Sequence, residues 1–410
     1  MSFFDTYIRD QAFLQRFDFA SAENYTIQLE EIRDYFESSL AASDTIQSQT
    51  RYRNLIAQVD EELRPLYARL KTDLESDNRI ASQFSYEITN KAFEGAGVEI
   101  KQTFDAIPFD ALKMLISITD NISLEGYEQT DRQFKPSREI DKLMRQHSRD
   151  YKKALRLSIA EGLGIDDTVK LFRELTEDTD NLKTHQVNAL TRTTIAEAMQ
   201  RTKEYTNEQN FSDVIEGYQW VTTLDNRTSK ICASKAGQIK KKLEDFPIRP
   251  PAHINCRSQL VPFGEFDDPK TMNQRARTWQ QKIVATNKGE IKSQFKLKTD
   301  KVMDIQVPKQ SSKFTSFDVF FKQMSKQDQI NWLGPQRYKM YQSGKLGMKQ
   351  LLDGQGRIRT VKELANLIGI KSEALQEIRR RDKQIKPKKP QISTRAASIQ
   401  RKRRKLNESK

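Results

Sequence analysis

The amino-acid sequence predicts an α+β protein that is mainly helical: a helical N-terminal half, a small mixed α/β motif domain, a helical C-terminal region and a disordered basic tail. Three observations predict this class. Apolar side chains recur every three or four residues over long stretches, which is the helical period. Alternating β-branched and aromatic residues, typical of strands, are concentrated at 214–223. The last residues are rich in Lys, Arg and Pro and have no apolar face.

Composition limits the class of protein. The chain has 410 residues, of which 36% are hydrophobic and 31% charged, so we expect two or three packed units with solvated helices or tails. No stretch approaches the roughly 20 consecutive apolar residues of a membrane helix. The start, MSFFDTYIRD, lacks the apolar core of a secretory signal. We therefore expect a soluble protein without membrane contact, made and kept in a cytoplasm-like compartment.

Charge is distributed unevenly along the chain. The formal net charge is +14, and residues 371–410 carry 15 basic and 4 acidic side chains, a local net charge of +11. Residues 1–80 carry 15 acidic and 9 basic side chains, a local net charge of −6. The C-terminal end is therefore expected to attract a polyanion such as nucleic acid, and the N-terminal end to repel one.

The N-terminal region is expected to form a long helical hairpin. Apolar residues at helical spacing predict helices at 22–42 and 49–78. Periodicity weakens beyond them, and Gly and Pro residues favour a boundary near 130–137. The full division is a helical N-terminal region at 1–136, a motif domain at 137–265, a helix and basic linker at 266–313, a helical C-terminal extension at 314–380 and a disordered basic tail at 381–410.

The motif domain is predicted to change from helices to a strand. At 214–223 the spacing puts Tyr218, Trp220 and Thr222 on one strand face. A turn at 225–227 and an irregular, Pro-rich stretch at 245–263 follow. The helices expected before the strand are one at about 138–161 ending at Gly162 and Gly164, a second capped by Asp166 or Asp167, and a third at about 183–209.

Beyond the motif domain the signals are weaker. We expect a helix at 270–285 around Trp279, a basic linker at 286–313 and a helix near 327–342. Thr360-Val361-Lys362-Glu363 has the pattern of a capping box, in which hydroxyl and carboxylate satisfy each other's backbone amides. A helix pair follows it, and we interpret the pair as a packing unit rather than a groove-reading helix-turn-helix, because its second helix offers few base-edge donors.

Chemistry is confined to few residues, since the chain has only two cysteines and three histidines. Cys232, His253 and Cys256 combine two thiolates and an imidazole, soft ligands that suit zinc. Asp225 is the nearest candidate for a fourth ligand, and an open fourth position would suit a hydrolytic water. Two alternatives stay open: the cysteines are small buried hydrophobes, or they form a disulfide. No phosphate loop, nucleophile elbow or Ser-His-Asp set is present.

The ordered motifs resemble one family. They are A-L-T-R-T-T-I-A-E-A at 189–198, then W-V-T-T-L-D-N-R-T-S-K-I-C at 220–232, and then P-P-A-H-I-N-C-R-S at 250–258. Together they resemble the phage Mu F-type head morphogenesis family, the minor capsid proteins of tailed phages. The resemblance covers about 137–265 and continues weakly at 315–353. The residues that carry the structural motif are Trp220, Asp225, Arg227, Thr228, Cys232, Gly237, His253, Asn255, Cys256 and Arg257. The family usually ends this motif Cys-Arg-Cys, whereas this chain has Ser258.

The resemblance implies a low-copy, non-enzymatic component of the phage head, made in the host cytoplasm and located in the head interior at the portal vertex. Portal protein, inner capsid proteins and packaged double-stranded DNA are the implied partners. The basic tail would contact that DNA without reading its sequence. The competing interpretation is a zinc-dependent nuclease or hydrolase acting on phage DNA, with zinc held by the Cys/His set. The tail residues expected to contact DNA are Lys386, Lys388, Lys389, Arg395, Arg401, Lys402, Arg403, Arg404 and Lys405.

Overall fold

The computed structural model of the protein describes residues 3–42, 49–119, 134–160, 165–267, 277–283, 304–310, 317–353 and 358–369. Within these ranges helices predominate, accompanied by a three-stranded and a two-stranded antiparallel sheet. The predicted class, mainly helical α+β, is confirmed. The basic tail lies outside the described residues. Among the helices that are described, none combines the length and apolar character needed to cross a lipid bilayer.

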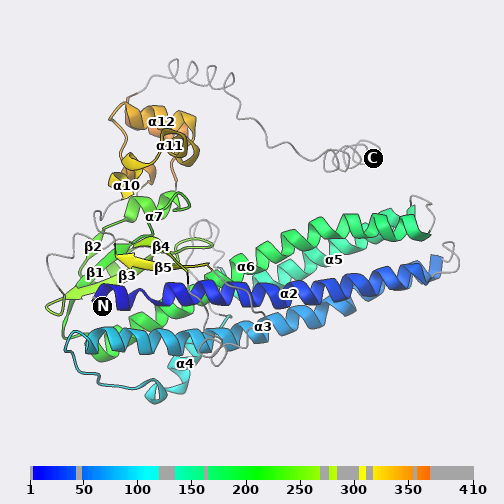
Figure 1. Cartoon of the computed structure of the whole chain (residues 1–410), viewed down its shortest axis with the longest axis horizontal. Coiled ribbons are helices and arrows are strands. Elements are labelled where there is room, and N and C mark those ends of the chain that lie inside the picture. The colour runs from blue at the N-terminus through cyan, green and yellow to red at the C-terminus, as the bar shows by residue number, and fades with distance from the viewer. Residues whose placement is uncertain are drawn as a thin grey trace.

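Four long helices form a projecting body that we call the helical arm. They are α2 (Asp10–Ala41), α3 (Gln49–Glu94), α5 (Pro136–Ala160) and α6 (Ile165–Phe211). They lie side by side as two hairpins and extend away from the sheet (Figure 1). The predicted helical hairpin is confirmed, although both helices are longer than expected. The arm is held by one apolar core whose buried members include Phe36, Val59, Leu63, Tyr151, Leu155, Phe172, Val187 and Ile195.

The expectation of two separate helices between 166 and 209 is wrong, because α6 is continuous over its 47 residues. No Gly or Pro lies between Ile165 and Phe211, so nothing in the local sequence stops the helix. A helix of this length spans ~70 Å. It therefore links the far end of the arm to the sheet as one rod (Figure 1).

A buried polar network crosses the arm. The imidazole of His147 is fully buried, with Nδ1 3.1 Å from the Tyr67 hydroxyl and Nε2 3.3 Å from an Asp180 carboxylate oxygen. Tyr151 donates to the same carboxylate at 2.9 Å, and Arg33 donates to its other oxygen at 3.3 Å. Because each buried polar atom needs a partner at one position, the network specifies how α2, α3, α5 and α6 align.

A small antiparallel sheet stands at the base of the arm, in the order β2-β1-β3. Its strands are β1 (Ile215–Val221), β2 (Ile239–Lys240) and β3 (Gln259–Gly264). The predicted strand at 214–223 is confirmed as β1. Trp220 pairs with Leu260 across β1 and β3 and is fully buried on one face. On the other face Val221 packs with Phe4 of α1 (Phe3–Tyr7) and with the end of α6, so both faces of the sheet are covered.

The C-terminal unit consists of α10 (Phe317–Gln323), α11 (Lys326–Leu333), α12 (Pro335–Gln342), the 3-10 turn η4 (Met348–Leu351) and α13 (Val361–Leu367). A single helix at 327–342 was expected and is wrong. Gly334 has a positive φ of 80° and precedes a proline, so the chain turns there. The capping box is confirmed: Glu363 N donates to the Thr360 hydroxyl at 3.2 Å, and Thr360 N donates to the Glu363 carboxylate at 2.6 Å.

The C-terminal unit packs directly on α7 (Lys230–Lys235), the helix that carries Cys232 (Figure 1). The indole Nε1 of Trp332 donates to the backbone oxygen of Thr228 at 2.6 Å, and Lys230 Nζ lies 5.1 Å from the Trp332 ring centre. Ala233 of α7 belongs to the apolar cluster of this unit. The weakly resembling segment at 315–353 is therefore anchored on the motif domain.

Two further strands were not expected. Residues assigned to a helix around Trp279 form β4 (Arg277–Ile283), which pairs antiparallel with β5 (Asp304–Gln310) inside the segment expected to be a linker. Both expectations are wrong. Trp and Thr fit a strand as readily as a helix, and the pairing partner lies more than 20 residues away, so the local sequence carries no signal for the pairing.

We predict that His147 makes the arm sensitive to acid. Burial lowers the pKa of His147, although the neighbouring Asp180 opposes this shift. The unfolded chain therefore takes up a proton near pH 6.5 while the folded chain does not, so stability is lost as the pH falls below about 6.5. Urea unfolding between pH 7.5 and 5 should show this loss in the wild type and in His185→Gln, whose side chain is exposed. It should be smaller in His147→Gln, and identical pH profiles would contradict the prediction.

Candidate functional site

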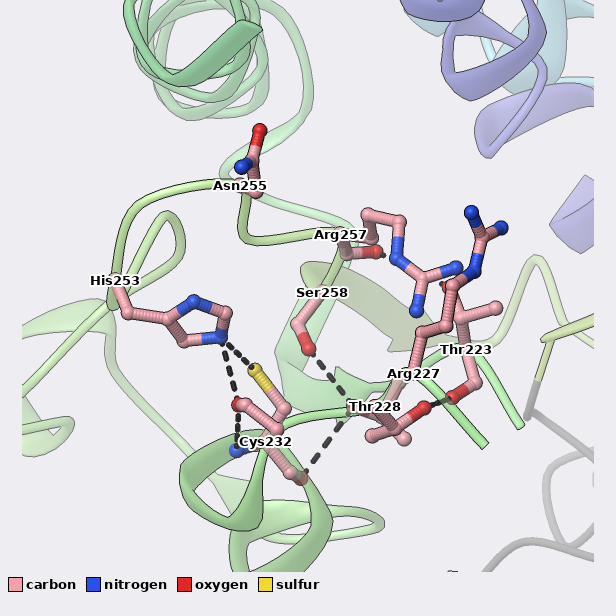
Figure 2. A pocket seen from close by; sticks show the side chains of 10 residues that line it. Thr223, Arg227, Thr228, Cys232, His253, Asn255, Arg257 and Ser258 are labelled. Atoms are coloured by element: carbon pink, nitrogen blue, oxygen red, sulfur yellow. Dashed lines mark hydrogen bonds between the residues drawn. The ribbon is translucent and has the colours of Figure 1, made fainter. Parts of the chain in front are cut away.

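The candidate site lies where α7 and the Pro-rich loop meet the sheet (Figure 2). Ser229 caps α7, accepting a hydrogen bond from Cys232 N at 3.2 Å. The loop then brings His253 and Cys256 back to α7, and β3 begins directly after Ser258. The three residues expected to meet, Cys232, His253 and Cys256, are therefore brought together by a short helix and one turn of the loop.

The Cys/His cluster is compact. Cys232 Sγ lies 3.2 Å from His253 Nε2 and 3.6 Å from Cys256 Sγ. His253 Nδ1 lies 2.8 Å from the Ile254 backbone oxygen, which can only accept, so Nδ1 carries the proton. The lone pair of Nε2 then faces the Cys232 thiol and the Ser229 hydroxyl, 2.7 Å away. The ligand atoms of the three residues all lie within 4.8 Å of one another.

Both cysteines are buried and free. Their sulfur atoms, 3.6 Å apart, are well beyond a disulfide bond length of about 2.05 Å. Burial raises the pKa of Cys232, and its contact with Cys256 raises it further. Burial also acts to raise the pKa of Cys256, but the hydrogen bond from Cys232 and the neighbouring His253 outweigh it and lower that pKa.

Asp225 holds the turn closed rather than joining the cluster. Its carboxylate receives both terminal nitrogens of Arg257, at 2.5 and 2.7 Å. It also accepts from Arg227 N at 2.9 Å and from the Thr228 hydroxyl at 3.2 Å. The Arg227 side chain approaches the same carboxylate less closely, with Nε 4.0 Å from it. Burial acts to raise the pKa of Asp225, yet Arg257 outweighs it and the pKa is lowered.

Gly237 and Asn255 adopt left-handed backbone conformations, with φ of 78° and 59°. Glycine and asparagine are the residues that tolerate this region best. Gly237 N donates to the Trp220 backbone oxygen at 2.9 Å and so closes the turn after α7. Asn255 N donates to the Thr193 hydroxyl at 3.0 Å, which ties the loop to α6. Both motif residues therefore shape the backbone of the site.

Ser258 follows Arg257 and directly precedes β3. Its side chain is buried, and its hydroxyl lies 2.8 Å from that of Thr222. Figure 2 shows it between the Cys232 side and the Arg257 side of a pocket that is open to solvent. The residues that line the pocket are Thr222, Thr223, Arg227, Thr228, Ser229, Cys232, His253, Asn255, Arg257 and Ser258.

Sequence reasoning missed the hydroxyl partners of the site. Ser229 orients His253, and Thr193 holds the loop against α6, yet neither was singled out. Hydroxyl residues are common, and only the positions of Thr193 within the 189–198 motif and of Ser229 within the 220–232 motif could have drawn attention to them. The tail residues expected to contact DNA, from Lys386 to Lys405, lie outside the described residues.

Comparison with known families supports the resemblance. Residues 149–261 match the family model described as phage Mu protein F like protein. The matched segment includes all of α6, β1, β2, the start of β3 and the whole Cys/His cluster. No curated protein and no solved structure matches the chain.

We predict that Asp225→Asn destabilises the protein much more than Arg227→Gln. Asparagine keeps the size of Asp225 but loses the charge that faces Arg257, which should cost about 2 kcal/mol of the free energy of unfolding. The Arg227 side chain is 65% exposed, so its loss should cost at most about 1 kcal/mol. Urea unfolding at pH 7 measures both, and equal costs would contradict the assignment of Arg257 as the main partner.

Proposed function

We propose that the protein is a low-copy minor head protein of a tailed phage. The observation that carries this proposal is the match of residues 149–261 to the phage Mu protein F-like family, which suggests a role in phage head morphogenesis. The proposed location is the head interior at the portal vertex. In this proposal the folded part docks on portal or inner capsid protein, and the basic C-terminus contacts packaged DNA.

The distribution of charge along the chain supports a protein contact by the folded part and a DNA contact by the C-terminus. Residues 1–80, with a local net charge of −6, contribute two helices to the arm, so the arm suits protein contact better than DNA contact. In Figure 1 the C-terminal unit lies above the sheet, whereas the arm extends from the sheet to the right. The segment of local net charge +11, residues 371–410, follows this unit in sequence. The hydrogen bond from Trp332 to the Thr228 backbone oxygen attaches the unit to the motif domain, so the basic segment follows a part of the chain that is fixed to that domain.

The competing interpretation, a zinc-dependent nuclease or hydrolase, finds less support. Among the described residues that line the pocket, none carries a carboxylate that could activate a water molecule. Asp225 lies behind it with both oxygens engaged by Arg257. His253 faces Ser229 and Cys232. These contacts suit a structural role of the site better than turnover.

We further propose that Cys232, His253 and Cys256 bind a structural zinc ion. A tetrahedral site with bonds of about 2.3 Å to sulfur and 2.0 Å to nitrogen places two sulfur atoms ~3.8 Å apart, and sulfur and nitrogen ~3.5 Å apart. The observed separations of 3.6 and 3.2 Å are close to these values. The Nδ1 contact of His253 with a backbone oxygen is the orientation typical of a metal-binding imidazole. Zinc would join α7 to the loop.

We predict that protein purified under reducing conditions contains one zinc ion per chain. Chelation should lower its melting temperature, because the metal stabilises the folded state only. Cys256→Ser and His253→Gln should lack zinc and melt like the chelated wild type, whereas His185→Gln, at an exposed position, should keep both properties. Elemental analysis and thermal unfolding measure this. Absence of zinc together with unchanged melting after chelation would favour buried thiols instead.

We predict that deletion of residues 386–410 separates the two proposed contacts. The truncated chain should still enter phage particles at a copy number far below that of the major shell protein, because the folded part remains. Its binding to duplex DNA in solution should weaken and become less dependent on salt, since fewer counterions are released. Quantitative mass spectrometry of purified particles and titrations at several salt concentrations measure both effects.

Two outcomes would contradict the proposed function. Wild-type protein that is missing from purified particles, or present at the copy number of the major shell protein, would exclude a minor head protein. Unchanged DNA binding after the deletion would exclude the basic tail as the DNA contact.

A further inference from the structure

The pocket beside the Cys/His cluster has an excess of positive charge. Arg227 and Arg257 both line it, and their side chains lie on the same side in Figure 2. Among the residues described as lining it, none is acidic, and the nearby Asp225 balances only one of the two guanidinium charges. Two positively charged side chains therefore line the pocket, and the Asp225 carboxylate balances one of them.

A third arginine lies near these two. Burial lowers the pKa of Arg192 on α6, and the charges of Arg257 and Arg227 lower it further, so the three guanidinium groups are close enough to interact. Cations that repel one another in a partly dehydrated setting favour an anion among them.

The donors available in the pocket match an anion. Arg257 is held in a fixed position by its bidentate contact with Asp225. Arg227 approaches that carboxylate only through Nε at 4.0 Å, and its terminal nitrogens make no hydrogen bond or ion pair with any described residue. A planar guanidinium fork suits the oxygen atoms of a phosphate group.

We propose that this pocket binds a single phosphate group through Arg227, with the fixed guanidinium of Arg257 beside it. The group is a phosphate of a nucleic-acid backbone or the free ion, which share this chemistry. The proposal goes beyond the function proposed above, because it places an anion contact in the folded motif domain and does not involve the tail. It also does not require a metal at the Cys/His cluster.

The test compares Arg227→Gln with Arg69→Gln in the full chain. Arg69 on α3 is a matched control, because its side chain is also 65% exposed and also lies near an aspartate, Asp73, at 3.6 Å. Melting temperatures are measured in sodium phosphate and in sodium chloride at equal ionic strength and pH 7. Phosphate stabilises proteins in general, but that effect acts equally on both variants.

At a phosphate concentration ten times the dissociation constant, wild type and Arg69→Gln should melt about 2 °C higher, relative to chloride, than Arg227→Gln. Arg227→Lys should retain part of the difference, because lysine keeps the charge without the fork. Each variant is compared with itself in two salts, so its own stability cancels. An equal response of Arg227→Gln and Arg69→Gln would overturn the proposal, as would a larger response to acetate than to phosphate.

Binding to a short DNA duplex distinguishes the two sources of phosphate. If the pocket takes a backbone phosphate, Arg227→Gln should reduce the salt dependence of binding by about 0.9 in the slope of log K against log salt. Arg69→Gln should leave that slope unchanged. A phosphate-dependent shift in melting without a change in slope assigns the pocket to the free ion, which also supports the proposal.

Discussion

The contact between Cys232 and the 253–256 turn is the constraint on which the rest of the site depends. It brings α7 against the Pro-rich loop. The other motif residues lie in β1, in the turns before and after α7, or in the loop itself. Ser229 connects it to the start of α7, and Thr193 connects the loop to α6. Because α7 also carries the C-terminal unit through the Trp332 hydrogen bond, a shift at the cluster would be transmitted to that unit.

The arm is coupled to this centre by α6, which runs without a break from the far end of the arm to β1. Near its end the buried Lys203 donates to the Tyr7 backbone oxygen at 2.7 Å and to the Gln259 side chain at 3.1 Å. That single side chain joins α1, α6 and β3. A protein that bound along the arm, as proposed, would contact helices that include α6. Because the other end of α6 packs on the sheet, and the sheet adjoins the candidate site, such binding could be felt at the site.

Local signals in the sequence predicted local structure well. The capping box at Thr360 and the strand around Trp220 were expected, because each depends on neighbours in the sequence. The meeting of Cys232 with His253 and Cys256, 21 and 24 residues away, was expected from their shared chemistry as soft metal ligands. Distant pairings without such a chemical signature were not expected. β4 is a strand because it pairs with β5, and the choice of Arg257 over Arg227 as the partner of Asp225 depends on how β3 approaches the turn. The spacing of residues within a single helix or strand does not indicate which distant residue will become a partner.

Ser258 connects the two proposals for the site. A thiolate at this position would add negative charge between the proposed metal ligands and the arginines. The neutral hydroxyl of Ser258 instead lies 2.8 Å from that of Thr222, so among the described pocket residues and their neighbours Asp225 is the carboxylate that faces Arg227 and Arg257. Serine at 258 is therefore compatible with both proposals: it leaves three protein ligands for the proposed metal and adds no negative charge to the proposed anion pocket. If the pocket binds phosphate as proposed, an ionised cysteine at 258 would weaken that binding.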